Sequence, residues 1–278
     1  LINASKLISK ILKKNDLVIY ESTVYPGTTD DLLIPILENY SKLKINVDFH
    51  CGYSPERLNP GSKFDDLKKI VKVTSGSNNF ATNKVDKLYK KIIKIGTHKT
   101  SSIKVAEAAK VIENCQRDLN IAFINELYLI FNKLNINNYE ILKAASTKWN
   151  FINFTPGLVG GHCIGVDPYY LTYISKKNNY DPRVILSGRK INDNMAVSVS
   201  KIFIQNLNKN KIKMKSSNIL LLGFTFKENC NDIRNSKIAD VYYYLKKKVR
   251  NIHIYDPIAN KRQVKEHYNI NLINDKIN

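Results

Sequence analysis

The stretch SIKVAEAAKVIENCQRDLNIAFINELYLIFNKL, residues 102–134, determines how the chain is organised. It contains no Pro and no Gly, and its apolar residues recur at spacings of three and four, the periodicity of an amphipathic helix. We therefore expect one long helix. Because a small domain cannot cover such a helix alone, its apolar stripe predicts a central connecting element or a dimer interface.

On the N-terminal side of this helix, short apolar runs alternate with helical patterns, and a Pro26-Gly27 turn lies between two of them. Such alternation is typical of an α/β domain. The expected strands are 17–20, 47–52 and 70–74. The expected helices are 4–13, 29–39 and 81–93, and a loop is expected at 59–61.

On the C-terminal side, a Gly-rich loop at 156–165 and a helix at 182–207 precede a second α/β pattern. In that pattern we expect strands at 219–223, 252–255 and 269–273, and helices at 236–247 and 264–268. The sequence therefore predicts an α/β fold with two Rossmann-like domains joined by a helical middle. The predicted domains are 1–98, 99–207 and 208–278.

The composition excludes several classes of partner. Lys and Arg number 44 against 24 Asp and Glu, a net charge of +20. The excess is mostly Lys scattered along helices, without zinc-finger spacing or an RNP-like aromatic strand, so we expect no nucleic-acid partner. No run of 18 apolar residues occurs, so we expect no membrane partner. A site for small anions agrees equally well with the sign of the charge.

The four cysteines stand far apart, without a C-x-x-C pair. This spacing argues against a zinc site and against a disulfide framework. We therefore expect no metal, and a reducing, cytoplasmic location.

Cys163 lies in the Gly-rich loop, where flanking glycines allow a ligand to approach a reactive sulfur. The alternative interpretation is that Cys163 is a small buried hydrophobe and the glycines only turn the chain. A protease-like dyad with His162 is disfavoured, because adjacent side chains point apart in most backbones.

Lys110 and Asn114 are four residues apart on the long helix and therefore share one face with apolar neighbours. A lysine in such a position either extends its ammonium to water along an apolar surface or has a function. The functional interpretation is that the ammonium holds an anionic oxygen.

Five segments, in order along the chain, resemble the successive signatures of the UDP-glucose/GDP-mannose dehydrogenase family. Two shorter segments, KWNF (148–151) and HCIGVDPYYL (162–171), are most similar to the branch of the family that acts on UDP-N-acetylhexosamines in surface-polysaccharide synthesis. The five signature segments are ESTVYPGTT (21–29), GYSPERLNPG (52–61), VAEAAKVIENCQRDLNIAFINE (105–126), GLVGGHCIGVDPYYL (157–171) and GFTFKENCNDIRNSK (223–237).

The resemblance implies an NAD-dependent, two-step oxidation of the sugar C6 alcohol to a carboxylate. Cys163 matches the family nucleophile, which forms a thiohemiacetal and then a thioester that water releases. Lys110 and Asn114 match residues that hold the substrate and the developing oxyanion. Asp167 matches the carboxylate near the ordered water, and Glu56 matches the acid in proton transfer during thioester hydrolysis.

The resemblance also implies contacts with the cofactor and the UDP-sugar. Thr23 matches a site residue beside the nicotinamide, and Arg234 matches an arginine that contacts the cofactor. Independently of the resemblance, the apolar stripe of the long helix leads us to expect a homodimer formed through that helix. The remaining substrate-binding positions are Arg57 and Leu58 beside Glu56, Gly160 in the Gly-rich loop, and the pair Phe226 and Lys227.

The chain departs from the family pattern in three places. Pro60 stands where some relatives have a second Glu, and Val166 stands where some have a cofactor-binding Lys. No G-x-G-x-x-G occurs, and the family has this fingerprint in a first βαβ unit, which would precede Leu1. We therefore expect a chain truncated at both ends that binds NAD poorly by itself.

Two other functions remain open at this point. Within the family, the alternative is UDP-glucose 6-dehydrogenase, because the acetamido pocket cannot be located from the sequence. From a different class, the alternative is a non-catalytic truncated remnant that only dimerises through its long helix.

Overall fold

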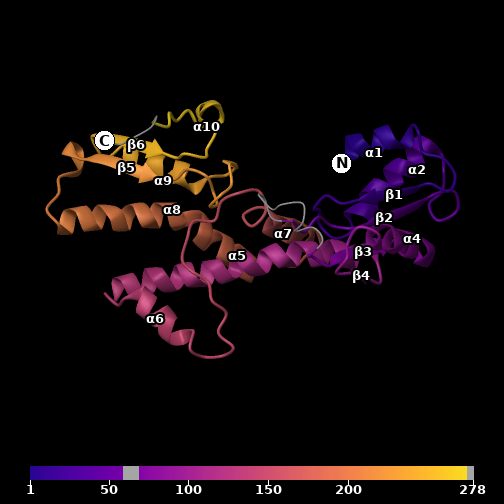
Figure 1. The fold of residues 1–278 in the computed structure, drawn as a ribbon, viewed down its shortest axis with the longest axis horizontal. Helices are drawn as coiled ribbons and strands as arrows, with labels where there is room; N and C mark the ends of the chain where they lie inside the picture. Colours follow the sequence, from indigo (N-terminus) through magenta and orange to yellow (C-terminus); the bar gives the residue numbers. More distant parts are fainter. Residues whose placement is uncertain (59–68, 274–278) are drawn as a thin grey trace. The chain divides into compact units, whose positions relative to one another are not determined.

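The structure, a computed structural model, describes residues 1–58 and 69–273 (Figure 1). The loop expected at 59–61, with Pro60, lies outside the described residues. Within them, no helix is both long enough and apolar enough to cross a membrane.

The contacts of the chain divide it into two compact units, which are described separately. Unit 1 comprises residues 1–114 and 169–181, and unit 2 comprises residues 115–168 and 182–278. The helix predicted at 102–134 is confirmed as α5, Ile103–Lys133, and the unit boundary falls within it.

Unit 1 contains a four-stranded sheet in the order β1-β2-β3-β4. The pairs β1–β2 and β3–β4 are parallel, whereas β3 runs antiparallel to β2. The strands are β1 Leu17–Tyr20, β2 His50–Tyr53, β3 Lys72–Gly76 and β4 Thr97–Lys99. The helices are α1 Ile2–Ser9, a π-helical turn Thr29–Leu33 that leads into α2 Ile34–Ser41, and α4 Asn79–Lys90.

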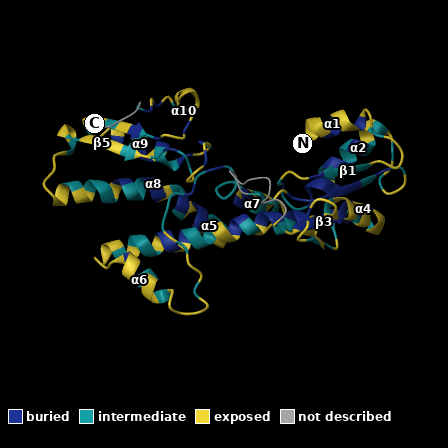
Figure 2. Ribbon diagram, viewed as in Figure 1, coloured by how far each residue is buried: buried dark blue, intermediate teal, exposed yellow. Residues whose placement is uncertain are grey.

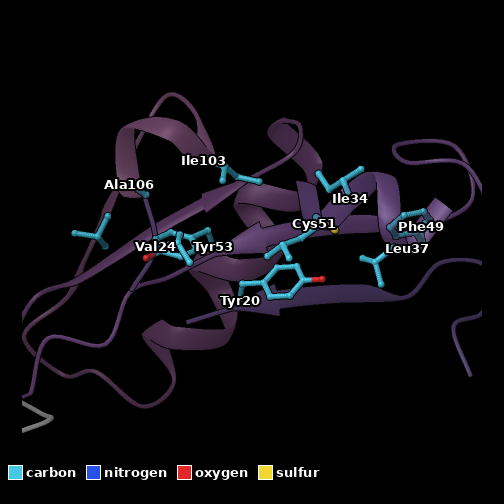
Figure 3. Packing of buried hydrophobic residues seen from close by; sticks show 11 residues of the cluster. Tyr20, Val24, Ile34, Leu37, Phe49, Cys51, Tyr53, Ile103 and Ala106 are labelled. Atoms are coloured by element: carbon cyan, nitrogen blue, oxygen red, sulfur yellow. The ribbon is translucent and has the colours of Figure 1, made fainter. Parts of the chain in front are cut away.

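The core of unit 1 forms where the apolar residues of β1 and β2 meet α2 and the start of α5. Leu37, Phe49 and Tyr53 are fully buried, and Figure 3 shows them among the other core side chains. Each such side chain contributes about 2 kcal/mol by leaving water. The phenol of Tyr20 remains satisfied in this core through a 2.7 Å hydrogen bond with Ser5 Oγ.

Unit 2 contains a parallel pair of strands, β5 Asn218–Leu222 and β6 Asn251–Tyr255. Helix α9, Lys237–Lys246, packs on β6 and against α8, Arg183–Lys209. A buried cluster that includes Phe224 and Ile254 fills the space between these elements. The other helices are the 3₁₀ turn Met214–Ser216, α6 Asn138–Ala145 and α10 Lys261–Tyr268. Helix α7, Asp167–Lys177, like α5, contributes residues to both units.

The strand predicted at 269–273 is wrong. Helix α10 ends at Asn269 in the left-handed conformation. Residues 270–273 bury Ile270 and Leu272, but within the described part of the chain a single backbone hydrogen bond, from Ile273 N to Ile254 O, joins them to β6. Alternating apolar residues therefore indicated burial correctly, but they did not indicate a strand, because a ladder of hydrogen bonds is required as well.

Candidate active site

In unit 1, polar residues gather at the carboxyl ends of β1 and β2, the edge at which α/β sheets bind ligands. Glu21 and Thr23 follow β1, and Glu56 follows β2. Lys72 begins the antiparallel strand β3 and therefore lies at the same edge. Its ammonium is 3.4 Å from Glu21 Oε1 and 3.7 Å from Glu56 Oε2.

The carboxylate of Glu56 has different partners at its two oxygens. Oε1 accepts hydrogen bonds from the backbone N–H groups of Arg57 (2.6 Å) and Leu58 (2.7 Å). Oε2 faces the Lys72 ammonium. Leu58 therefore supports the site through its backbone N–H, which donates to Glu56.

Arg57 joins the loop after β2 to helix α5. Its Nη1 donates to the carbonyl of Val71 at 2.6 Å, and its Nη2 is 2.7 Å from Glu113 Oε1. Glu113 directly precedes Asn114. The guanidinium of Arg57 thus connects two of the segments that carry predicted substrate-binding residues.

The turn that carries Thr23 is held by Glu107, a fully buried acid on α5. Its carboxylate accepts hydrogen bonds from Gly27 N (2.6 Å), Thr29 N (2.9 Å) and Thr29 Oγ1 (2.7 Å). Burial raises the pKa of Glu107, and these hydrogen bonds partly offset that rise. Because Gly27 has a φ of +95° and a Cβ there would lie 2.7 Å from Asp31 Oδ2, a side chain at this position would be strained.

Lys110 and Asn114 both lie on the buried side of α5, with 9% and 6% of their surface exposed. Among the described residues, no hydrogen bond or ion pair is found for the Lys110 ammonium. A cation in such a place is costly unless an anion or polar group meets it. This buried position agrees with the predicted role of Lys110 in holding an anionic oxygen.

In unit 2, Cys163 differs from the other three cysteines. Cys51, Cys115 and Cys230 are buried, whereas Cys163 is half-buried. Burial raises the pKa of Cys115, as it does that of Cys51, to about 12, which keeps these thiols protonated and unreactive. Cys163 is therefore the cysteine best exposed to a ligand.

The loop that carries Cys163 packs tightly on the segment after β5. A Cβ at Gly160 would lie 2.9 Å from the Cβ of Phe226 and 2.8 Å from the carbonyl oxygen of Asn235. At Gly161, with a φ of +80°, a Cβ would lie 2.8 Å from the Phe226 ring. Two hydrogen bonds of 3.0 Å, from Gly161 N to Arg234 O and from Asn235 Nδ2 to Gly161 O, fix this contact. The predicted residues Gly160 and Phe226 are thus brought together.

Arg234 brings a positive charge to this loop. Its guanidinium donates to Asp232 at 2.9 and 3.0 Å through Nε, and lies 3.4 Å from His162 Nε2. These bonds hold the pKa of Asp232 below its usual value, and Asp232 raises the pKa of Arg234. Cys163 also interacts electrostatically with Arg234. The same attraction stabilises negative charge on the Cys163 sulfur.

A buried polar network supports the start of the same loop. Asp118 Oδ1 accepts hydrogen bonds from Arg189 Nη1 (2.6 Å) and Asn192 Nδ2 (2.7 Å). Asn192 also accepts from Asn125 Nδ2, and Asn125 makes two hydrogen bonds with the backbone of Gly157. Helices α5 and α8 therefore fix the point at which the loop begins.

A cavity of about 510 Å³ opens at the carboxyl ends of β5 and β6. Its lining includes Phe226 and the exposed Lys227, two of the predicted substrate-binding residues, together with Asp256. The position corresponds to the ligand-binding edge of an α/β unit.

The wall of this cavity depends on Asp256, which is 4% exposed. Its carboxylate accepts from the backbone N–H groups of Phe224 (2.6 Å), Thr225 (3.0 Å), Ile258 (2.8 Å) and Ala259 (2.9 Å). Burial by itself would raise its pKa, but the four donors outweigh burial and hold the pKa below its ordinary value.

We expect Asp256→Asn to destabilise unit 2 by about 2 kcal/mol at neutral pH, because an amide oxygen cannot satisfy all four donors. In the wild type, the contribution of the carboxylate is present above about pH 4, the ordinary pKa. It is lost as the pH falls through the lowered folded-state pKa. Urea unfolding of both proteins at pH 7 and pH 3 measures this difference, which should shrink at pH 3. Asp240→Asn, an exposed aspartate on α9, is the control and should change little.

The structure places the twelve predicted site residues in two groups. Sequence reasoning missed several residues that support them, namely Glu21, Lys72, Glu107, Arg189 and Asp232. Among the described residues, no three His, Cys, Asp or Glu side chains cluster as a metal site would require. Unit 1 holds Thr23, Glu56, Arg57, Leu58, Lys110 and Asn114, and unit 2 holds Gly160, Cys163, Asp167, Phe226, Lys227 and Arg234.

Two α/β units with polar residues at the carboxyl edges of their sheets, and one accessible thiol, define a nucleotide-binding class of protein. Models of one family match the chain in three consecutive parts. They are the NAD binding domain (residues 1–93), the central domain (104–194) and the UDP binding domain (220–278) of the UDP-glucose/GDP-mannose dehydrogenase family. The chain belongs to this family.

Individual relatives agree with the family assignment. The chain is 53% identical over 270 residues to the UDP-N-acetyl-D-glucosamine 6-dehydrogenase of Pseudomonas aeruginosa, covering 97% of this chain and 64% of that protein. It is 49% identical to protein CapL of Staphylococcus aureus, covering 99% of this chain and 65% of CapL. A solved structure of UDP-D-ManNAc dehydrogenase from Pyrococcus horikoshii superimposes with a TM-score of 0.86 at 33% identity, covering 93% of this chain and 61% of that one. The chain thus spans slightly less than two thirds of these relatives.

Proposed function

We propose that the protein is an NAD-dependent dehydrogenase that oxidises the C6 hydroxyl of a UDP-N-acetylhexosamine to the carboxylate, for surface-polysaccharide biosynthesis. The observation that carries this proposal is Cys163, the half-buried thiol near Arg234, in a chain 53% identical to a UDP-N-acetyl-D-glucosamine 6-dehydrogenase. The names of the relatives support an N-acetylated sugar as the substrate.

The proposed mechanism gives each predicted residue one task. The Cys163 sulfur adds to the aldehyde carbon and holds it as a thiohemiacetal, whose oxidation leaves a thioester. Lys110 and Asn114 hold the substrate oxygen on which negative charge develops. Water then forms the new C–O bond as the C–S bond breaks, with Glu56 and Asp167 placed to handle its protons. Two molecules of NAD, bound one after the other, would each supply the acceptor for one hydride, the first as the C6 alcohol becomes the aldehyde and the second as the thiohemiacetal becomes the thioester.

The residues of unit 1 fit part of a nicotinamide cofactor site. Strands β1 and β2 are parallel, and the turn with Thr23 leaves their carboxyl edge, where such sheets bind dinucleotides. We assign Thr23, and Arg234 in unit 2, to the cofactor. The 278 residues contain no G-x-G-x-x-G, so the pyrophosphate contacts are assigned to none of them.

We assign the uridine diphosphate part of the substrate to the 510 Å³ cavity beside Lys227 and Phe226. The exposed ammonium of Lys227 can pair with a phosphate oxygen, and the Phe226 ring offers an apolar surface. The match of residues 220–278 to a UDP binding domain supports this assignment. Arg57, Leu58 and Gly160 complete the proposed substrate contacts.

We also propose three domains, at 1–98, 99–207 and 208–278, a cytoplasmic location, and a homodimer formed through α5. Exposed apolar side chains follow one face of this helix at successive spacings of seven, eleven and seven residues, and Figure 2 shows much of its C-terminal end as exposed. Sedimentation of the purified protein measures the oligomeric state, and a monomer would contradict the dimer. The exposed apolar side chains on this face of α5 are Val105, Ile112, Phe123 and Ile130.

Incubation of the purified protein with NAD and one UDP-sugar at a time tests the function. We expect two NADH per molecule of uronic acid with UDP-N-acetylglucosamine or one of its epimers, and much slower reaction with UDP-glucose. Faster oxidation of UDP-glucose would replace the proposed substrate, and no NADH with any of these sugars would refute the proposed activity.

A further inference from the structure

Lys72 occupies a position that the proposed mechanism does not yet use. It is the first residue of β3, which pairs with β2 in the register Gly52 to Gly76 and Tyr53 to Ser75. Lys72 thus lies at the end of the strand pair at which β2 finishes with Tyr53, and Glu56 follows three residues later. The antiparallel strand therefore delivers a lysine to the edge at which Glu56 leaves the sheet.

The surroundings of the Lys72 side chain are charged on two sides and aromatic on a third. Only 5% of the side chain is exposed, whereas the side chains of Glu21 and Glu56 are each 47% exposed. The ammonium lies 5.1 Å from the ring centroid of Tyr89, whose hydroxyl donates to Glu21. A buried ammonium is costly when it is unpaired. The carboxylates of Glu21 and Glu56 compensate for that cost, so the ion pairs restrict the position of Lys72 as well as the positions of the two acids.

The partners of Glu56 show what Lys72 contributes. Oε1 is occupied by the N–H groups of Arg57 and Leu58, so Oε2 is the oxygen available to exchange a proton with water. Within residues 1–58 and 69–273, Lys72 is the cation that pairs with Oε2. The neighbouring cation, Arg57, is engaged by Val71 and Glu113 instead.

We propose that Lys72 is a positioning residue for Glu56, an inference that rests on the proposed function. Its ion pairs hold Glu56 Oε2 in place and tie Glu56 to Glu21, two residues before Thr23. In thioester hydrolysis, a C–O bond to water forms and the C–S bond breaks. One water proton passes to Glu56 Oε2 and returns to the departing sulfur. Lys72 itself gains and loses no proton in this step.

The test is Lys72→Met in the purified protein, since methionine fills a similar space without the charge. Glu21 and Glu56 remain half-exposed to water, so we expect the variant to fold. We expect the rapid formation of NADH up to the thioester to persist. Steady-state turnover should fall by about 10- to 100-fold, the usual result of a small misplacement of a reacting group. An acyl adduct on Cys163 should then accumulate, and intact-protein mass spectrometry detects it.

Three further variants make the outcome specific. Lys72→Arg should restore most of the steady-state rate, and Lys72→Gln should behave like Lys72→Met. Lys90→Met removes a lysine from another ion pair of unit 1, that with Asp86, and should leave turnover unchanged. Thermal unfolding of each variant gives the folded fraction to which the rates are normalised.

The results separate this inference from the proposed function. The positioning role is overturned if turnover is unchanged in Lys72→Met. It is also overturned if the folded fractions of both Lys72→Met and Lys72→Gln lose the rapid phase of NADH formation and the steady-state phase equally. A wild-type protein that oxidises no UDP-sugar refutes the proposed function instead. The proposed function and the positioning role are both supported if the wild type is active and the Lys72→Met variant accumulates the acyl adduct on Cys163.

Discussion

Cys163→Ser lowers the rate of acid formation by at least about 10³-fold, as is typical when a covalent nucleophile is removed. A serine hydroxyl is a much weaker nucleophile at neutral pH than a cysteine sulfur unless a general base activates it. Arg234 interacts electrostatically with Cys163, and replacement of the sulfur removes the atom that forms the proposed thioester. The measurement is the steady-state formation of uronic acid and NADH from the UDP-sugar identified for the wild type.

The matched control is Cys230→Ser in the same unit. Cys230 is buried and also interacts electrostatically with Arg234, so its replacement tests whether any cysteine near this arginine matters. We expect its turnover to remain within about threefold of the wild type, as for a residue outside the chemistry. Near-normal turnover of Cys163→Ser would refute the covalent mechanism.

Lys110→Ala is the second change for which we expect a large effect, a loss of about 3 kcal/mol of transition-state stabilisation, or roughly 100-fold in kcat. The ammonium is buried, and the described residues offer it no ion pair, so the substrate oxygen is the proposed partner. Lys110→Met keeps the apolar stem and should lose nearly as much activity. A comparison of kcat, KM and unfolding temperature distinguishes lost charge from lost packing.

Lys104→Ala is the control on the same helix. Lys104 is half-exposed and pairs with Asp31 at 3.2 Å, so its loss should affect neither kcat nor KM strongly. If Lys110→Ala and Lys110→Met change stability but not kcat, the lysine only covers apolar surface. The oxyanion role would then be wrong.

The elements that could be predicted are those whose signal is local. The limits of α5 follow from a long segment without Pro or Gly, and β1 matches its apolar run exactly at 17–20. Helix α7 and strand β4 were not predicted, because α7 begins in a Gly-rich context and β4 has only three residues, two of them exposed. Their existence depends on tertiary partners, which a pattern of single residues does not reveal.

The supporting residues of the site divide in the same way. Glu107 had a signal, because it shares the periodicity of Lys110, Asn114 and Asp118, at spacings of three and four on the buried side of α5. No sequence pattern singled out Lys72, because its role depends on the antiparallel pairing of β3 with β2. The placement of a residue across strands becomes visible only when the pairing is known.

Because the four cysteines differ in burial, the rate at which each thiol is labelled measures the local unfolding of its surroundings. A thiol-reactive dye should modify Cys163 within the native protein and reach the other three only as their surroundings unfold. Cys51 lies in unit 1, while Cys115 and Cys230 lie in unit 2, so the order in which they become labelled ranks the units by kinetic stability. The same exposure makes Cys163 the first target of peroxide, which converts a thiolate to sulfenic acid.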